Sequence, residues 1–217
     1  MKIMRTLVQC DFDGTITHED ISFLLLDSFT SEDWRPLLAE YRQGKISVGL
    51  FNIRAFAMIR ADEQTLVKFV KHKAETRAGF CELLDYCLKK DYQFVVVSNG
   101  LDFYINAILE DIGVKNIEVF AAQARFSPRG IEAKYIGPRG NAVLDNFKEE
   151  YIRLFLRRDY RVVYIGNGIS DISPARLAHR IFATGEMLTC CREMNLDCTP
   201  FNDLNDVVRG LELDSPG

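Results

Sequence analysis

The chain has 217 residues, of which 47% are apolar and 27% are charged, and its formal net charge at pH 7 is −4. A chain of this length and composition can bury a sizeable core, which excludes a disordered protein. The mild negative charge and the scattered Lys and Arg residues exclude a strong nucleic-acid footprint, and no stretch approaches the roughly 20 apolar residues of a membrane span.

The N-terminus and the cysteines predict a cytosolic protein. The apolar stretch after the basic start MKIMR is too short for a signal peptide. None of the six cysteines forms a C-x-x-C pair, so we expect reduced thiols rather than a zinc site or a disulfide framework. Because the sequence holds only three histidines, a histidine-rich metal site is also excluded.

A block of helices is predicted directly after the first strand. Residues 6–10 form a short apolar run that is typical of a buried strand. The next 55 or so residues contain four segments with apolar side chains at helical spacing and no convincing strand. We therefore expect residues 18–74 to form a helical insert, and residues 1–17 and 75–217 to form the core.

The rest of the chain alternates between strands and helices, which predicts an α/β fold with a mostly parallel sheet. Continuous apolar and β-branched runs predict buried strands at residues 93–98, 117–122, 161–166 and 181–184. Helices are predicted at residues 78–90, 101–112, 147–158 and 173–180, with one or two more in the tail. A Pro-Arg-Gly turn within residues 123–135 predicts a β-hairpin.

Polar residues follow three of the predicted strands, where open parallel sheets bind their ligands. They are Asp11, Asp13, Gly14 and Thr15 after the first strand, Ser98, Asn99 and Gly100 at the end of the second, and Asn167 and Asp171 after the fourth. Lys148 begins the helix before that fourth strand, and we expect its ammonium group to reach the same edge of the sheet.

This set of groups predicts Mg²⁺-dependent chemistry on a phosphate ester. Oxygen ligands without a His or Cys cluster indicate a hard cation, and Mg²⁺ would relieve the repulsion between the paired aspartates. One aspartate would attack phosphorus to form an aspartyl-phosphate, and the other would act as acid and base. The donors available to the phosphoryl oxygens are the Thr15 and Ser98 hydroxyls, the backbone N–H groups after Gly14 and Asn99, and the Lys148 ammonium.

The segments DFDGTIT, SNG, a later lysine and GNGISD resemble the four motifs of the haloacid dehalogenase superfamily. The resemblance implies a Rossmann-like core with a helical type 1 cap and a small hairpin flap, as in its phosphoserine-phosphatase-like members. It implies that Asp11 is the nucleophile and Asp13 the acid/base. It also implies that Lys148 stabilises both the nucleophile and the bound phosphate. The implied Mg²⁺ positions are Asp11, Asp13, Asn167 and Asp171, and the implied phosphate ligands are Thr15, Ser98, Asn99, Gly100 and Lys148.

A narrower resemblance concerns the substrate. SNGLDFYI, NIRAF and CREMNLDCTPFNDL are similar to the methionine-salvage phosphatase family that acts on 2-hydroxy-3-keto-5-methylthiopentenyl-1-phosphate. The similarity implies substrate contacts at Asp20 and Arg54. For both residues, a position on the cap surface without substrate contact is an alternative of equal weight. Phosphoserine or another small phosphomonoester also fits the motifs, as does phosphotransfer to an alcohol, and the oligomeric state is not indicated.

Asn167 departs from the superfamily, which normally has Asp at the first position of the fourth motif. An amide oxygen can ligate Mg²⁺ but brings no charge, so we expect weaker metal binding. Three interpretations remain: an enzyme that works with weakly bound Mg²⁺, an inactive relative that binds a phosphorylated ligand, or an Asp-to-Asn change introduced to trap a complex. We favour the first, because the other chemical positions are intact.

Overall fold

The computed structural model describes residues 4–213 and contains a seven-stranded sheet in the order β4-β3-β2-β1-β5-β6-β7. The strands are β1 (Arg5–Cys10), β2 (Gln93–Leu101), β3 (Glu118–Ser127), β4 (Gly130–Lys134), β5 (Tyr160–Gly166), β6 (Arg180–Ala183) and β7 (Thr199–Pro200). All neighbouring pairs are parallel except β3 and β4. The predicted α/β fold with a mostly parallel sheet is therefore confirmed.

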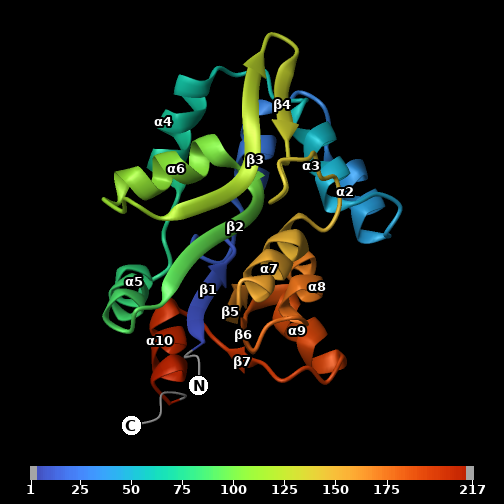
Figure 1. Cartoon of the computed structure of the whole chain (residues 1–217). Coiled ribbons are helices and arrows are strands. Elements are labelled where there is room, and N and C mark those ends of the chain that lie inside the picture. The colour runs from blue at the N-terminus through green and yellow to red at the C-terminus, as the bar shows by residue number, and fades with distance from the viewer. Residues whose placement is uncertain (1–3, 214–217) are drawn as a thin grey trace.

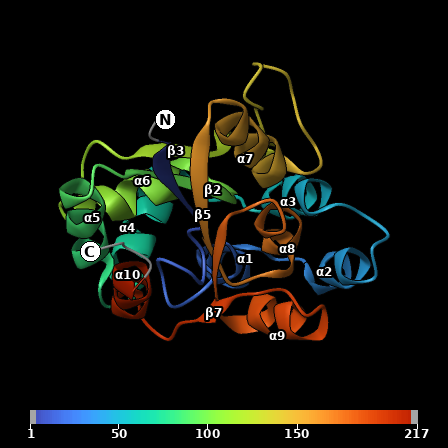
Figure 2. The ribbon, with the colours of Figure 1, turned by 60° about the horizontal axis from the view of Figure 1, so that its bottom comes forward.

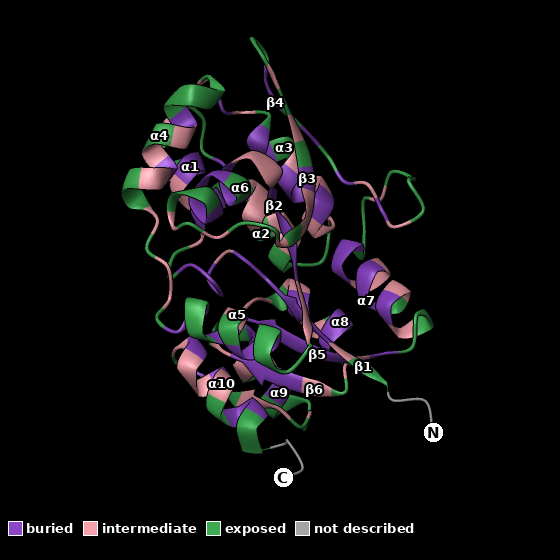
Figure 3. Cartoon of the chain, turned by 60° about the vertical axis from the view of Figure 1, so that its left-hand side comes forward, coloured by how far each residue is buried: buried purple, intermediate pink, exposed green. Residues whose placement is uncertain are grey.

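Helices cover both faces of this sheet, so its central strands are buried on both sides (Figures 1 and 3). The covering helices are α5 (Phe80–Lys89), α6 (Asp102–Asp111) and α10 (Leu204–Leu213) on one side, and α7 (Phe147–Arg157), α8 (Ile172–Ala175) and α9 (Gly185–Glu193) on the other. The last four residues of β1 are buried without interruption, as expected of a central parallel strand. In residues 4–213, no helix combines the length and apolar character needed to cross a membrane.

The helical insert, residues 18–74, folds as four helices between β1 and α5. They are α1 (Ile21–Phe29), α2 (Arg35–Arg42), α3 (Val48–Phe56) and α4 (Glu63–Lys73). Thr17 and Thr76 form an antiparallel bridge where the chain leaves the core and returns to it. Rings of Phe23, Trp34 and Phe51 pack together inside the insert, with centroids 4.9–6.4 Å apart. In Figures 1 and 2, α2 and α3 lie on the same side of the sheet as α7 and α8.

Three boundaries differ from the predictions. The helix predicted over residues 173–180 ends at Ala175, because the chain then joins the sheet: the His179 N–H donates to the Val162 carbonyl of β5, and Arg180 begins β6. The strand predicted to end at Ser98 continues to Leu101, and its register with β3 shifts between Val97 and Leu101. The predicted hairpin exists, but its first arm is the second half of β3, whose first half pairs with β2 in the main sheet. The hairpin therefore extends the sheet toward the helical insert, where β4 packs against α3 (Figure 1).

Candidate active site

The carboxyl ends of three adjacent strands bring the predicted motifs together. Cys10, at the end of β1, is paired with Val96 of β2 on one side and Ile165 of β5 on the other. Asp11 continues β1 by donating its N–H to the Ile165 carbonyl at 2.9 Å. Ser98 and Asn167 follow shortly after the paired residues on β2 and β5. Three segments far apart in the sequence thus meet at one edge of the sheet.

Lys148 links two carboxylates at the floor of this edge. Its Nζ atom lies 2.8 Å from Asp11 Oδ1 and 2.7 Å from Asp171 Oδ1, and its side chain is only 3% exposed. Burial alone would lower the pKa of Lys148, but the two carboxylates raise it above its ordinary value. Lys148 is therefore a permanent cation in contact with Asp11.

Asp171 is fully buried, and protein donors occupy both of its oxygens. Oδ1 accepts from Lys148 and from the Tyr164 hydroxyl at 2.6 Å, and Oδ2 accepts the N–H groups of Asn167 and Gly168 at 3.1 and 2.9 Å. Burial raises the pKa of Asp171, but these donors more than offset that effect and hold it below its usual value. The Asp171 carboxylate therefore positions Lys148 and the fourth motif.

Asp13 is held on the other side of the site by the start of α1 and by α6. Its Oδ1 accepts the Ile21 N–H at 3.3 Å, and its Oδ2 accepts the Tyr104 hydroxyl, with Ser22 Oγ at 3.4 Å. Burial and the charge of Asp20 raise the pKa of Asp13 well above its usual value. A carboxyl group with a raised pKa can carry a proton near neutral pH, as a general acid must.

Gly100 leaves the room that this arrangement needs. A Cβ atom at residue 100 would lie 1.8 Å from the Tyr104 hydroxyl oxygen and 2.6 Å from Asp13 Oδ2. The Gly100 N–H donates to Ser98 Oγ at 3.0 Å within the last part of β2. Any larger residue at position 100 would push Tyr104 away from Asp13.

The loop after Asp13 is joined to the fourth motif. Thr15 Oγ1 donates to Asn167 Oδ1 at 3.0 Å, and Gly14, with φ +70°, packs so closely that a Cβ there would lie 2.2 Å from Asn167 Nδ2. Arg77 holds the same loop from behind, donating Nε to the Thr15 carbonyl at 3.0 Å and Nη2 to the Gly14 carbonyl at 2.9 Å. The loop and Asn167 therefore form one fixed unit.

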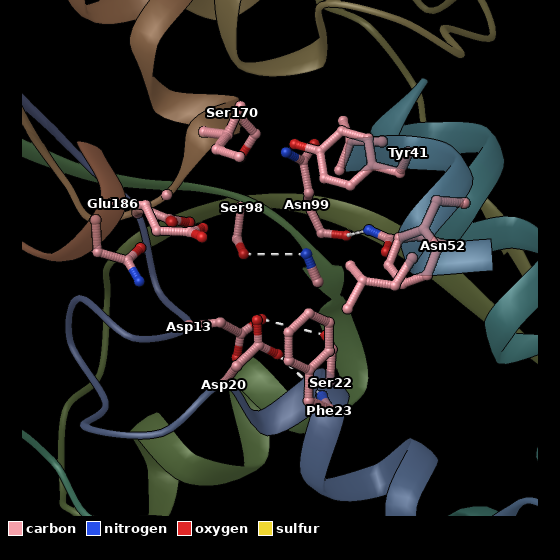
Figure 4. A pocket seen from close by; sticks show the side chains of 18 of the residues that line it. Asp13, Asp20, Ser22, Phe23, Tyr41, Asn52, Ser98, Asn99, Ser170 and Glu186 are labelled. Carbon is pink, nitrogen blue, oxygen red and sulfur yellow. Dashed lines mark hydrogen bonds between the residues drawn. The ribbon is translucent and has the colours of Figure 1, made fainter. Parts of the chain in front are cut away.

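A pocket of about 230 Å³ opens above these groups, between the core and the helical insert (Figure 4). Its polar floor and sides include Asp11, Asp13, Asp20, Ser98, Asn99, Gly100, Lys148 and Asn167. Its apolar wall comes from the insert, through Phe23, Leu38, Val48 and Phe51. At the mouth, Arg42 of α2 pairs with Glu186 of α9 at 3.3 Å. The pocket can therefore hold a small molecule that is charged at one end and partly apolar at the other.

Three predicted site residues do not line this pocket. Thr15 is buried against Asn167, and Asp171 is buried beneath Lys148. Arg54 lies on the outer side of α3, half exposed, with Nη1 3.9 Å from Glu40 Oε2. Asp20 does line the pocket and also caps α1, where its Oδ1 accepts the Phe23 N–H at 3.0 Å.

Sequence reasoning missed several groups around the pocket. Tyr104 and Ser22 contact Asp13, and Asn52 lines the pocket beside Asn99. A tyrosine, a serine and an asparagine within helices carry no signal that separates them from ordinary helix residues. Only the position of Tyr104, shortly after SNG, placed it near the site.

The donor set fits a hard cation in part. Burial and the nearby Asp171 raise the pKa of Asp11 to about 7, and the contact with Lys148 opposes this rise. A cation beside Asp11 would lower that pKa. Asp11 and Asn167 offer side-chain oxygens, but in residues 4–213 no three His, Cys, Asp or Glu side chains are grouped as a metal site. This set suits Mg²⁺, which keeps several water ligands and binds few carboxylates.

Comparison with known proteins assigns the chain to a family. A family model described as haloacid dehalogenase-like hydrolase matches residues 8–176, so the chain belongs to that family. The predicted family and enzyme class, a haloacid dehalogenase-like hydrolase, are thereby confirmed. The match spans all four motif segments, from the first strand to the helix after GNGISD.

Two curated relatives share the narrower resemblance. The chain is 28% identical over 214 residues to the 2-hydroxy-3-keto-5-methylthiopentenyl-1-phosphate phosphatase of Bacillus cytotoxicus, covering 96% of this chain and 97% of that protein. It is 32% identical over 212 residues to the bifunctional enzyme MtnB/MtnX of Bacillus licheniformis. That match covers 96% of this chain but only 49% of the longer relative. The predicted likeness to methionine-salvage phosphatases is therefore confirmed.

Solved structures support the fold. A phospho-aspartyl intermediate analogue of phosphoserine phosphatase superposes with a TM-score of 0.69 at 20% identity, covering 94% of this chain and 98% of that one. A substrate-bound phosphoserine phosphatase gives 0.70 at 19% identity, with 94% and 97% coverage. At this identity the likeness establishes the fold alone.

Proposed function

We propose that this chain is a phosphatase that hydrolyses a small phosphomonoester through a phosphorylated Asp11. The observation that carries the proposal is the placement of Asp11, bound to Lys148, and Asp13, bound to Tyr104, in one pocket. The names of the curated relatives support it. A cytosolic location remains a prediction.

The two aspartates divide the chemistry. An Asp11 carboxylate oxygen forms a bond to phosphorus as the ester P–O bond breaks, and protonated Asp13 gives its proton to the departing alkoxide. Asp13, now ionised, then takes a proton from a water molecule. The water oxygen bonds to phosphorus, the bond to Asp11 breaks, and inorganic phosphate leaves. Lys148 and the Ser98 hydroxyl hold the phosphoryl oxygens throughout.

Mg²⁺ is the proposed cofactor. The Asp11 carboxylate, the Asp13 backbone carbonyl and Asn167 Oδ1 would hold it, whereas Asp171, whose oxygens are already bonded, would support the site through Lys148. The bound ion would draw phosphate to the pocket and neutralise its charge.

The pocket favours an uncharged, partly apolar leaving group. Arg42 is the one arginine that lines it among the described residues, and it is paired with Glu186. Lys148, the other cation among the described lining residues, is paired with Asp11 and Asp171, so neither cation is free for a substrate carboxylate such as that of phosphoserine. The apolar wall from the insert suits a chain such as the methylthiopentenyl group named for the relatives. We propose that residues 18–74 act as a cap that shapes this wall.

Trapping the intermediate tests the reaction. Enzyme quenched with acid during turnover and treated with hydroxylamine should carry a hydroxamate at Asp11, since hydroxylamine attacks the acyl carbon of an aspartyl-phosphate. Asp11→Asn should give no adduct and no turnover while its thermal unfolding midpoint stays close to wild type. Turnover by that variant, or an adduct at another residue only, would overturn the mechanism.

Asn167 supports a second candidate, a binding protein that no longer hydrolyses its ligand. This candidate predicts calorimetric binding of phosphomonoesters without release of inorganic phosphate at any Mg²⁺ concentration. Release of phosphate in a metabolite panel that includes phosphoserine and the methylthiopentenyl ester would exclude it. Adding an alcohol acceptor to the same panel would reveal phosphotransfer as a new ester product.

A further inference from the structure

The backbone and the side chain of Asn99 have different surroundings. Its carbonyl oxygen accepts Asn52 Nδ2 of α3 at 2.7 Å and the Tyr135 hydroxyl at 2.5 Å. Asn52 Nδ2 also lies 2.9 Å from the Tyr135 hydroxyl oxygen. All three residues are at least nine-tenths buried. The peptide of Asn99 is therefore fixed by both the helical insert and the segment that follows β4.

The side-chain oxygen of Asn99 lacks such a partner among the described residues. The residue is 9% exposed, and its buried Oδ1 atom has no hydrogen-bond partner in residues 4–213. A buried carbonyl oxygen without a donor costs free energy, and native proteins usually satisfy it with water or a ligand. Asn99 lines the pocket between Ser98 and Gly100, and Figure 4 shows its side chain at the pocket, near Tyr41.

The place of Asn99 decides which part of a substrate it could meet. Its two chain neighbours are proposed phosphate ligands, so a group in contact with its side chain would lie close to the phosphorylated carbon. A hydroxyl group can donate to Oδ1 and accept from Nδ2, whereas an alkyl group can do neither. The name of the Bacillus cytotoxicus relative places a hydroxyl group on the carbon next to the phosphorylated one and a keto group on the carbon after that.

We propose that the side-chain amide of Asn99 is a specificity-determining group that hydrogen-bonds an oxygen on the leaving group, next to the phosphorylated carbon. This inference rests on the proposed function for the location of the phosphate. It names the substrate class as phosphate esters of oxygenated alcohols, in preference to plain alkyl phosphates.

A matched pair of esters tests this role. Glycerol 1-phosphate carries a hydroxyl beside the phosphorylated carbon, and n-propyl phosphate lacks it. Binding of both is measured by calorimetry in the Asp11→Asn background, so that the result does not depend on turnover. Adding Asn99→Leu should weaken binding of glycerol 1-phosphate about tenfold, the effect of one hydrogen bond, and leave n-propyl phosphate unchanged. Asn99→Ala should have the same effect. Because alanine is smaller than asparagine, this result would show that the lost hydrogen bond weakens binding, and that crowding by the leucine side chain does not.

Stability provides a second readout. Because Asn99→Leu removes a buried amide oxygen that has no partner in residues 4–213 and puts an apolar group of similar size in its place, its unfolding midpoint should equal or exceed that of wild type. Equal weakening of both esters, no weakening of either, absence of binding or a large loss of stability would each overturn the inference. Ester-selective weakening without any hydrolysis by the wild-type enzyme would sustain it while rejecting the proposed function. Hydrolysis by the wild-type enzyme, together with an unchanged ester preference in Asn99→Leu, would overturn the inference and sustain the proposed function.

Discussion

At the scale of single residues, the proposed Mg²⁺ site can be tested at Asn167, one of its proposed ligands. Asn167→Asp should tighten Mg²⁺ binding at least about tenfold, since unit charges about 4 Å apart interact by roughly 4 kcal/mol near a protein surface. Calorimetry with Mg²⁺ alone measures the change. Asn167→Ala, which removes the amide oxygen bound to Thr15, is the matched control and should weaken binding. Unchanged affinity in both variants would show that residue 167 holds no metal.

Tyr104 donates a hydrogen bond to Asp13, so under the proposed mechanism its hydroxyl should matter most when the leaving group needs a proton. Tyr104→Phe should lower kcat/KM for an alkyl phosphate about tenfold, a fraction of what general acid catalysis contributes. p-Nitrophenolate leaves without a proton, so kcat/KM for p-nitrophenyl phosphate should change little. Tyr151→Phe is the control, since it removes a hydroxyl that donates to the Ile136 carbonyl outside the pocket. Equal losses on both esters would contradict a role through Asp13.

The sequence predicted those site residues whose positions the chain topology dictates. Asp11, Ser98 and Asn167 could be placed together because parallel strands end at one edge, and the structure puts all three in one pocket. The contact of Tyr104 with Asp13 could not be foreseen, because it depends on the space left by Gly100. The outward direction of Arg54 depends on the packing of α3, which spacing along the sequence does not fix.

At the scale of elements, Asp20 caps helix α1, but the burial of its charge costs the folded state free energy. Its carboxylate caps α1, but burial raises its pKa from 3.8 to about 6. A raised carboxyl pKa means that the folded state disfavours the charge, so wild type loses stability as pH rises from about 4 to 6. Asp20→Asn keeps an N-cap acceptor without the charge.

Asp20→Asn should therefore be more stable than wild type above pH 6, by about 1–2 kcal/mol after allowance for partial exposure, and equally stable near pH 4. Urea unfolding at both pH values measures the difference. Asp62→Asn is the control: the exposed carboxylate of Asp62 caps α4, and hydrogen bonds to Thr65 lower its pKa, so this variant should gain nothing at either pH. A gain for Asp20→Asn that is the same at both pH values would contradict the assigned cause.

Element boundaries were less predictable than element types. The run QFVVVS identified β2, but its extension through Asn99 to Leu101 depends on pairing with β3 after a register shift. The hairpin turn was visible in Pro-Arg-Gly, whereas the sharing of β3 between the main sheet and the hairpin was not. Both differences come from strand pairing between distant segments, which local sequence patterns do not record.

At the scale of the whole molecule, Arg77 joins segments near the two ends of the chain to the site. Besides its bonds to the Gly14 and Thr15 carbonyls, its Nη1 donates to the Asn202 carbonyl at 2.6 Å, and its guanidinium lies 5.8 Å from the Phe201 ring centroid. Its own N–H donates to the Ile16 carbonyl at 2.7 Å. The loop that follows Asp13 is thus anchored to the segment before α10 by one side chain.

Arg77→Ala should lower the free energy of unfolding by about 3 kcal/mol, because three charge-assisted hydrogen bonds to carbonyls are lost. It should also lower kcat, since the loop fixes Asn167 and the two aspartates. Added guanidinium at millimolar concentration should restore part of the activity of Arg77→Ala, and Arg77→Lys should not match wild type because an ammonium cannot span the three carbonyls. Arg153→Ala, which breaks an exposed pair with Glu149, is the control and should cost at most about 0.5 kcal/mol. Lost stability with unchanged kcat would mean that the anchor serves the fold and leaves the catalytic loop unaffected.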